Sequence, residues 1–287
     1  MTSSRSGPDR MPDVLIVGAQ KSGTTTLFET LSRHPDVCFG PDKEPGILLH
    51  QRGHRALYES HFRNCTDSDI LIDGSTAYSM ATVHPGVPTR AVNVLAPGFV
   101  IVYIVRDPLS RLMSHHYHEL KHGMVDHDLG VAIEQMPSLV DNGKYGMQLA
   151  AWLDHVPKEQ VLVLCLEALA RDPHGEIARL ASHLRLDGLA IPRASSNDAS
   201  RRVARGAWKG IIGSGLYRQT VRRVVPRSMR SAVAQRLLPS IPVQPKAPSL
   251  ELQGRLRDAY SSDLEDFRQM LTLDEASRVP WLTHNQS

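Results

Sequence analysis

A glycine loop near the start of the chain has the spacing of a phosphate-binding loop. Gly18 and Gly23 enclose four residues and give the pattern G-x-x-x-x-G. Loops of this spacing that bind ATP or GTP carry a lysine directly after the second glycine, but this chain has Thr24 there. Its loop lysine is Lys21, two residues before Gly23. A cation in the middle of the loop can neutralise the oxygen of a leaving group without a metal ion.

Hydroxyl groups and a predicted helix add to this anion site. A glycine loop between a buried strand and a helix points backbone N–H groups at an anion, and the positive helix end favours that anion. The hydroxyl donors gather around the first helical turn, at Ser22, Thr24, Thr25 and Thr26. The alternative is a glycine-rich turn with one solvated lysine. Agreement between strand, loop and helix favours the anion site.

A second group of anion-binding residues begins at Arg106. It follows the apolar run 99–105, and Asp107 and Pro108 are a typical N-cap and first helical residue. Arg106 is therefore expected at the carboxyl end of a parallel strand, where open α/β sheets bind ligands. Ser114, two helical turns later, can join Arg106 on one phosphate. The alternative is a surface pair of Arg106 with Asp107.

Together these residues resemble the sulfotransferases that use 3′-phosphoadenosine 5′-phosphosulfate (PAPS). The segment QKSGTT, residues 20–25, is similar to their donor loop. Their 3′-phosphate motif runs R-x-P-x-x-R-x-x-S-x-x-Y, and the matching residues are Arg106, Pro108, Arg111, Ser114 and Tyr117. The resemblance implies that residues 21–25 bind the 5′-phosphosulfate, that Lys21 assists its departure, and that Arg106 and Ser114 bind the 3′-phosphate. It also implies 3′-phosphoadenosine 5′-phosphate (PAP) as the product and no required metal.

The same resemblance suggests the catalytic base. In carbohydrate sulfotransferases of the heparan-sulfate type, a KEP segment supplies the glutamate proposed as base, and Glu44 matches it with Lys43 before it. A neutral hydroxyl needs such a base within hydrogen-bond reach. A solvated pair of Lys43 with Glu44 is the alternative. Nearby histidines are fallback bases, at His50, His54 and His61.

Further segments resemble the acceptor and donor pockets of the family. DGSTAYSM, residues 73–80, is similar to the family's E-K-S/T-P-x-Y segment, with Gly74 in place of the lysine. The resemblance makes Asp73, Ser75 and Tyr78 candidate lining residues for the acceptor, with strand-end packing as the alternative. Lys43 is a further candidate acceptor-binding residue. Candidates for the donor pocket outside the two motifs are Tyr145, Arg201, Arg202 and Arg205.

The elements that must position these residues form an α/β pattern. Continuous apolar runs predict four strands, at residues 13–19, 69–73, 99–105 and 160–166. Continuous rather than alternating runs indicate burial on both faces, so we expect a central parallel sheet in a three-layer sandwich. A helix over 24–34 completes a P-loop-like strand–loop–helix unit, and the amphipathic pattern 250–271 predicts a C-terminal helix.

Strand patterns end well before the C-terminus. We therefore expect a disordered leader over 1–12 and a single domain over 13–287. Within that domain, 13–190 is the predicted α/β core and 191–287 a mainly helical extension. The arginine-rich segment 218–236 fits a mobile lid, an anionic-acceptor surface or a solvated helix face.

Composition limits the class of protein. The chain has 287 residues, of which 41% are hydrophobic and 22% charged, as in soluble globular proteins. The net charge of +3 is too small to indicate nucleic acid as a partner. The longest apolar run, 99–105, is far shorter than a membrane span. Three cysteines without a framework spacing, behind a polar N-terminus, predict a reducing, cytoplasmic setting.

Histidines follow Arg106 at helical spacing. His115, His118 and His122 stand three and four residues apart, which is a spacing that metal sites use. No other residue pattern supports a metal here. We expect a polar or partly buried histidine face instead.

The sequence thus predicts a PAPS-dependent sulfotransferase that acts on a hydroxyl of a carbohydrate or of a hydroxylated small molecule or secondary metabolite. One rival is a P-loop kinase that uses ATP and Mg²⁺, which Thr24 and the pair of Arg106 with Ser114 disfavour. The other is a non-catalytic nucleotide-binding relative. The acceptor and the oligomeric state stay open, because variable loops build the acceptor pocket.

Overall fold

The structure is a computed structural model that describes residues 10–67, 69–189, 245 and 247–282. These residues belong to one unit built from the ranges 1–191 and 244–287. Residues 192–243 lie outside that unit and outside the described residues. The basic segment 218–236 falls among them, so the expected helical extension over 191–287 is described only in its last part.

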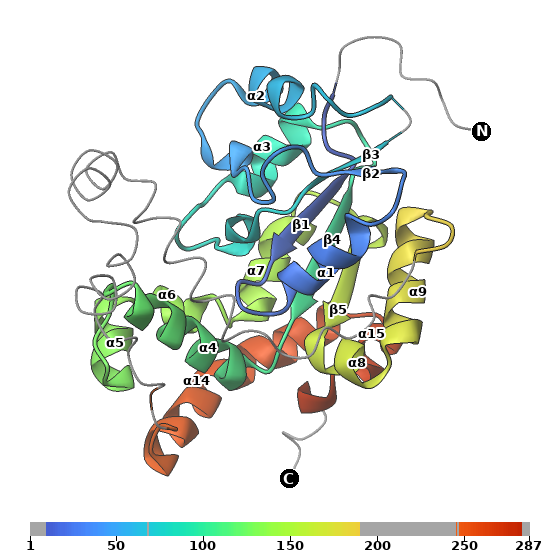
Figure 1. Ribbon diagram of the computed structural model, residues 1–287. Helices are drawn as coiled ribbons and strands as arrows, with labels where there is room; N and C mark the ends of the chain where they lie inside the picture. Colours follow the sequence, from blue (N-terminus) through green and yellow to red (C-terminus); the bar gives the residue numbers. More distant parts are fainter. Residues whose placement is uncertain (1–9, 68, 190–244, 246, 283–287) are drawn as a thin grey trace, which may run out of the picture. The chain divides into compact units, whose positions relative to one another are not determined.

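Five parallel strands form the central sheet (Figure 1). Their bounds are β1 Val14–Gly18, β2 Val37–Cys38, β3 Ile70–Asp73, β4 Val100–Val105 and β5 Val161–Cys165. The strand order is β2-β3-β1-β4-β5, and every pair in it is parallel. Four strands lie at the predicted apolar runs. The sequence analysis missed β2 because two residues are too short for a recognisable pattern.

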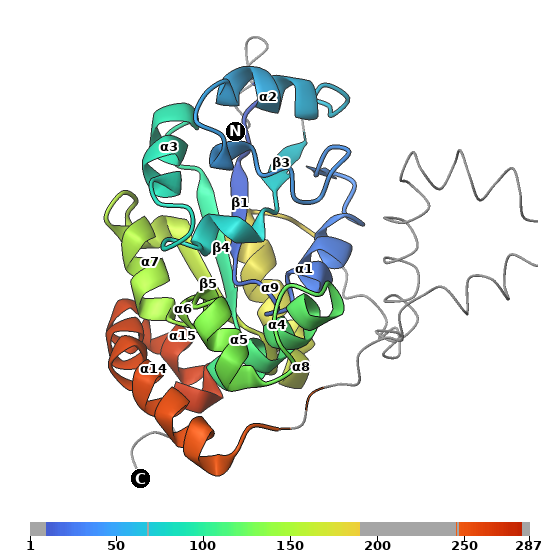
Figure 2. The same ribbon diagram turned by 90° about the vertical axis from the view of Figure 1, so that its left-hand side faces the viewer.

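Alternate residues of the strands face two separate core layers. Leu15 and Val17 of β1 pack in the layer that includes α3 (Val87–Val94) and α7 (Tyr145–Leu153). Val14 and Ile16 pack in the layer of α1 (Thr24–Leu31) and α9 (Pro173–Leu184). Figure 2 shows these helix pairs on opposite sides of the sheet. The predicted three-layer α/β sandwich is therefore confirmed.

The remaining elements connect or extend these layers. The helices are α2 His54–His61, α4 Pro108–Lys121, α5 Leu129–Gln135, α6 Ser138–Asp141, α8 Leu166–Arg171, α14 Leu250–Met270 and α15 Leu273–Ser277. The 3₁₀ turns are η1 Ile47–Leu49, η2 Thr76–Ser79, η3 Lys158–Gln160 and η4 Pro280–Leu282. Among the described residues, none of the helices has the length and apolar character that a membrane crossing requires.

Helix α14 confirms the predicted amphipathic C-terminal helix and fixes the start of α7. Its buried side chains are Leu256, Tyr260, Leu264 and Phe267. The Asp263 carboxylate accepts hydrogen bonds from the backbone N–H groups of Gly146 and Met147, at 2.9 and 2.8 Å. Two N–H groups of the first turn of α7 thus find a partner, which anchors the C-terminal helix to the α/β core.

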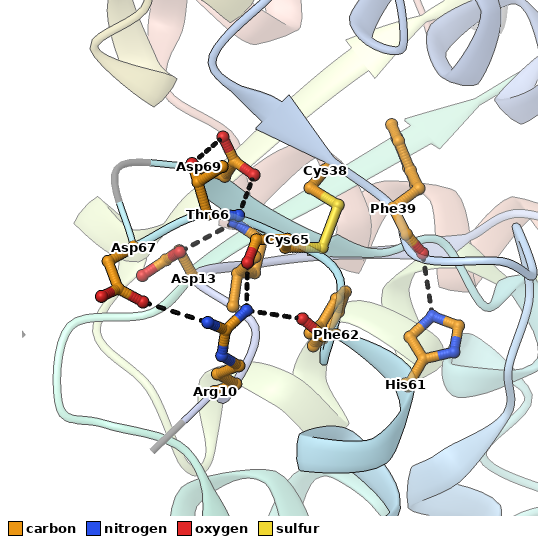
Figure 3. Close-up of a disulfide and its surroundings, with 11 residues drawn as sticks. Arg10, Asp13, Cys38, Phe39, His61, Phe62, Cys65, Thr66, Asp67 and Asp69 are labelled. Atoms are coloured by element: carbon orange, nitrogen blue, oxygen red, sulfur yellow. Dashed lines mark hydrogen bonds and ion pairs between the residues drawn. A yellow bond between two sulfur atoms is a disulfide. The ribbon is translucent and has the colours of Figure 1, made fainter. Parts of the chain in front are cut away.

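The folded unit begins before the predicted start of the domain. Met11 is buried in the core. The Arg10 guanidinium donates hydrogen bonds to the main-chain oxygens of Phe62 and Cys65, and it pairs with Asp67 at 3.2 Å (Figure 3). Arg10 and Met11 were expected within the disordered leader. They are ordered because the guanidinium satisfies the carbonyl groups at the end of α2.

A disulfide joins two cysteines that the sequence left unpaired. Cys38 at the end of β2 is bonded to Cys65 after α2, across a sequence separation of 27 residues (Figure 3). Beside it, His61 Nε2 donates to the Phe39 carbonyl at 2.8 Å. The cysteine spacing concealed this pair because the two positions meet only in the fold. Disulfides are typical of oxidising compartments, and the cytoplasmic setting stays a prediction.

Removing this disulfide should destabilise the protein without changing its fold. For a closed loop spanning the observed separation, the chain-entropy account gives a loss of roughly 3–4 kcal/mol in the free energy of unfolding. Urea unfolding of a Cys38→Ser/Cys65→Ser variant measures it. The same variant serves as the control, because a thiol reductant should weaken the wild type and leave the variant unchanged. Equal stability with and without reductant in the wild type would contradict the expectation.

Candidate active site

The loop between β1 and α1 is folded as an anion cradle. Lys21 and Gly23 have left-handed backbone conformations, with φ of 68° and 100°. Gly23 is the N-cap of α1, and no described side chain caps that end, so the first N–H groups of the helix are available to a ligand. A Cβ added at Gly23 would lie 2.7 Å from Leu166 Cδ1, and the left-handed φ would strain any side chain there.

The hydroxyl groups of the loop divide into buried and exposed ones. Thr25 and Thr26 are exposed at the start of α1, and Thr24 is buried. Ser22 is fully buried. Its hydroxyl interacts with the Tyr145 phenol but completes no hydrogen bond of normal geometry among the described residues. A buried hydroxyl of this kind fits a site whose ligand supplies the missing partner.

Positive charge is concentrated around Lys21. Burial is the main cause that lowers the pKa of the Lys21 ammonium, and Lys121, Arg106 and Lys43 lower it further by repulsion. Glu119 acts in the opposite direction. These positive charges repel one another. An anion bound among them reduces that repulsion, so the arrangement favours anion binding.

Arg106 lies beside the loop at the end of β4. Its Nη1 is 3.4 Å from the Lys21 carbonyl oxygen, although the two residues are 85 positions apart in the chain. The following helix starts as predicted, because the Asp107 carboxylate accepts from the Ser110 N–H at 2.8 Å and Pro108 opens α4. The two predicted anion-binding motifs thus meet at one edge of the sheet, at the carboxyl ends of β1 and β4 (Figure 1).

Tyr145 contacts the main chain of Arg106. Its side chain is fully buried, and its hydroxyl donates to the Arg106 carbonyl at 2.6 Å. The phenol thus holds the backbone of Arg106, and a place for Tyr145 near the donor stays a prediction. Burial raises the pKa of Tyr145 well above its usual value, which keeps the hydroxyl protonated as a donor.

A cleft of about 500 Å³ opens beside Arg106. One wall is α4, with Ser114 and Tyr117, and the other is the segment that leads into α14 together with Gln253 and Leu256. Its volume lies in the range of small-molecule sites. Arg106 and Ser114, predicted to share one phosphate, both line this cleft. The further candidates Arg201, Arg202 and Arg205 lie outside the described residues.

Lys43 and Glu44 lie on the loop that returns over α1. Lys43 Nζ is 3.0 Å from Glu44 Oε1 and 3.4 Å from Thr25 Oγ1. The other carboxylate oxygen, Glu44 Oε2, accepts from Thr76 Oγ1 at 2.9 Å. Glu44 is exposed, and a donor holds each of its two carboxylate oxygens in place.

Asp73, Ser75 and Tyr78 form a buried network beneath this loop. Asp73 accepts from Tyr58 and Tyr78 at 2.8 and 2.6 Å, and from Ser75 Oγ at 2.5 Å. All three are almost fully buried, and their place in the acceptor pocket stays a prediction. They position the loop: Ser75 Oγ accepts from the Gly46 N–H at 2.8 Å, and the Tyr78 hydroxyl accepts from the Leu48 N–H at 3.0 Å.

Two of the three fallback histidines, His54 and His61, are hydrogen-bonded to the backbone, and His50 is exposed. His54 Nε2 donates to the His50 carbonyl at 2.8 Å, and His61 Nε2 donates to the Phe39 carbonyl at the same distance. The histidines of α4 form the expected polar face. His115 contacts Arg111 and Glu119, each at 3.3 Å. Arg111 of the resembled motif is fully buried, so it supports the helix rather than the cleft.

Protonation of His115 is expected to weaken the fold in acid. Burial, followed by the charge of Arg111, lowers the pKa of His115 to about 3. In the unfolded chain this imidazole binds its proton near pH 6.5. The free energy of unfolding therefore keeps its full value above that pH and decreases as the pH falls toward 3. The slope is at most about 1.4 kcal/mol per pH unit. A His115→Gln variant should show a flatter decline in urea unfolding at stepped pH, whereas His122→Gln, an exposed control, should follow the wild type.

Two site residues were missed by the sequence analysis. Thr76 contacts Glu44 from a different segment, and only the fold reveals that contact. The charge of Lys121 contributes to lowering the pKa of Lys21. The Lys121 Nζ lies 4.4 Å from the centre of the Tyr117 ring. Its position, seven residues after Ser114 in one helix, is a periodic pattern that could have predicted it.

The fold and these two motifs define a P-loop-like protein with a site for a phosphate-bearing ligand. A family model described as the sulfotransferase domain matches residues 11–190. The match covers well over half of the chain, and the protein therefore belongs to the sulfotransferase family.

Known proteins of this family show how far the likeness extends. Human heparan sulfate glucosamine 3-O-sulfotransferase 6 is 30% identical over 194 residues, which cover 64% of this chain and 55% of that protein. Human heparan sulfate glucosamine 3-O-sulfotransferase 3B1 is 25% identical over 245 residues, covering 77% and 61%. The chain thus spans little more than half the length of these relatives. A crystal structure of a sulfotransferase from Alicyclobacillus acidocaldarius matches in fold, with a TM-score of 0.55 at 21% identity, over 70% of this chain and 93% of that one.

Proposed function

We propose that this protein transfers a sulfuryl group from PAPS to a hydroxyl group of an acceptor. The observation that carries the proposal is the contact of Arg106 with the main chain of Lys21 at 3.4 Å. It joins a loop suited to a 5′-phosphosulfate to an arginine suited to a 3′-phosphate at one sheet edge. Membership of the sulfotransferase family supports this assignment.

The residues present fit the donor. The uncapped start of α1 and the buried, unpartnered Ser22 hydroxyl offer hydrogen-bond donors to an anion. The cleft of about 500 Å³ next to Arg106 offers room for a nucleoside bisphosphate. Ser114 on the wall of the same cleft supplies a further donor. ATP-binding loops require a lysine directly after the second glycine, and this chain has Thr24 there, after Gly23.

The chain's own residues take two chemical roles. Bound PAPS supplies the sulfuryl group, whose bond to the 5′-phosphate oxygen breaks as a bond to the acceptor oxygen forms. Glu44 removes the proton from the attacking hydroxyl, since its carboxylate is exposed and is oriented by Thr76. Lys21 neutralises the negative charge that develops on the departing phosphate oxygen. Arg106 and the start of α1 hold the phosphates so that the reacting atoms are aligned.

The relatives support a proposal for the acceptor class. The names of the similar human proteins describe sulfation of a glucosamine hydroxyl in heparan sulfate. We infer a carbohydrate hydroxyl, or that of a hydroxylated small molecule, as the acceptor of this chain. Such alcohols are poor nucleophiles without a base, which agrees with an exposed carboxylate at Glu44.

Ligand titration tests the donor assignment. We expect PAP to bind the wild type, and ATP with Mg²⁺ to bind far more weakly, in isothermal titration calorimetry. In Arg106→Met the affinity for PAP should fall by about 10- to 100-fold, because a charge-assisted phosphate contact is lost. Adenosine 5′-monophosphate is the matched control, since it lacks the 3′-phosphate and its affinity should change little. Binding of ATP with Mg²⁺ but not of PAP would replace the proposal with a kinase.

A further inference from the structure

Lys43 packs closely against Gly74. A Cβ added at Gly74 would lie 3.0 Å from the Lys43 carbonyl oxygen and 3.9 Å from Lys43 Cγ. The backbone of Gly74 is outside the left-handed region, so the close approach of Lys43, not a turn, makes this position small. Lys43 therefore lies directly beside the start of the segment 73–80.

The Lys43 ammonium lies between the donor loop and the base. It is 3.4 Å from Thr25 Oγ1 at the first turn of α1 and 3.0 Å from Glu44 Oε1. It also lies 5.8 Å from the centre of the Phe28 ring, which fixes the side chain over α1. Its charge contributes to the repulsion felt by Lys21. Lys21 and Lys43 thus act on one region of space.

We propose that Lys43 binds the transferring sulfonate of the donor and gives up its ion pair with Glu44 to do so. This inference rests on the proposed function. The sulfonate carries the negative charge that Lys43 then pairs with, and Glu44 keeps its hydrogen bond from Thr76 on the other oxygen. Glu44 Oε1 becomes free to accept the acceptor's proton only when the donor is present.

This arrangement couples donor binding to the availability of the base. Without a donor, the pair of Lys43 with Glu44 occupies the oxygen that faces α1. With a donor, the ammonium has a competing anion close by, and the exchange costs little because one ion pair replaces another. The same exchange explains why a lysine precedes the base in a loop that otherwise needs none.

Comparison of PAPS with PAP tests the proposal, because PAP lacks only the sulfonate. In Lys43→Met, which keeps the aliphatic stem over Gly74, the dissociation constant of PAPS should rise about tenfold. The dissociation constant of PAP should change less than twofold. Lys43→Arg retains the cation and should recover most of the PAPS affinity. Lys144→Met is the matched control, since Lys144 is another lysine in an ion pair, 2.8 Å from Asp141, and should leave both constants unchanged.

A double-mutant cycle tests the coupling to Glu44. In Glu44→Gln the carboxylate no longer competes for Lys43, so PAPS should bind several-fold more tightly while PAP is unaffected. In the double variant Lys43→Met/Glu44→Gln that gain should vanish. Equal losses of PAP and PAPS affinity in Lys43→Met would overturn the proposal in favour of a structural role, and so would unchanged PAPS affinity. A wild type that binds neither PAP nor PAPS would instead overturn the proposed function itself.

Discussion

Replacing Lys21 with alanine is expected to lower kcat for sulfuryl transfer by on the order of 100- to 1,000-fold, because its ammonium stabilises charge only in the transition state. The residue is held for this task by a left-handed backbone with φ of 68°, and its carbonyl is tied to Arg106. Single-turnover transfer from PAPS to an excess acceptor, followed by mass spectrometry, measures the effect.

The pattern of losses identifies the role of Lys21. Affinity for PAP should fall much less than kcat, because the phosphates keep the backbone N–H groups and Arg106 as partners. Lys21→Arg should recover part of the rate, since it retains the charge at a shifted position. Arg33→Ala removes an exposed cation beyond the end of α1 and is the control that should leave kcat unchanged. A Lys21→Ala protein with more than a tenth of the wild-type kcat would show that the lysine is not the main stabiliser of the leaving group.

Replacing Glu44 with glutamine is expected to lower kcat by on the order of 100- to 10,000-fold with an alcohol acceptor, the range that general-base catalysis contributes. The substitution keeps the shape of the side chain, so the hydrogen bond from Thr76 can persist while the proton acceptor is lost. The rate should fall much less with an acidic phenol as acceptor, because a phenol ionises without help. Steady-state kinetics with a matched alcohol and phenol measure this contrast.

Two controls separate Glu44 from its neighbours. Asp42→Asn removes an exposed carboxylate from the same loop and should leave kcat unchanged. His50→Gln removes an exposed fallback base and should also have little effect. If Glu44→Gln keeps full turnover and His50→Gln does not, the base is the histidine and the role given to Glu44 is wrong.

The two anion-binding motifs could be predicted from the sequence alone because each consists of residues close together in the chain. The loop at Gly18–Gly23 and the turn at Arg106 follow apolar strands directly, and a parallel sheet brings all such strand ends to one edge. The start of α4 at Asp107 and Pro108 was likewise set by capping chemistry of neighbouring residues. The contact between Arg106 and Lys21 is the result.

The roles predicted for Asp73, Ser75, Tyr78 and Tyr145 stay predictions, and the structure shows that these side chains are buried. A motif places a residue at the end of an element but does not say whether its side chain points to the ligand or beneath it. Here the Asp73 carboxylate accepts hydrogen bonds from three side-chain hydroxyls under the loop. A buried carboxylate is tolerated only with such partners, and the partners come from separate parts of the chain.

By itself, the sequence determined the α/β class, the donor loop and the strand-end arginine, because glycine spacing, helix capping and buried apolar runs act within a few residues. Only the tertiary structure decided which distant groups meet. It paired Cys38 with Cys65, set Thr76 against Glu44, placed Lys43 over Gly74 and closed the cleft beside Arg106 with the start of α14. These contacts depend on the packing of whole elements, which no local pattern encodes.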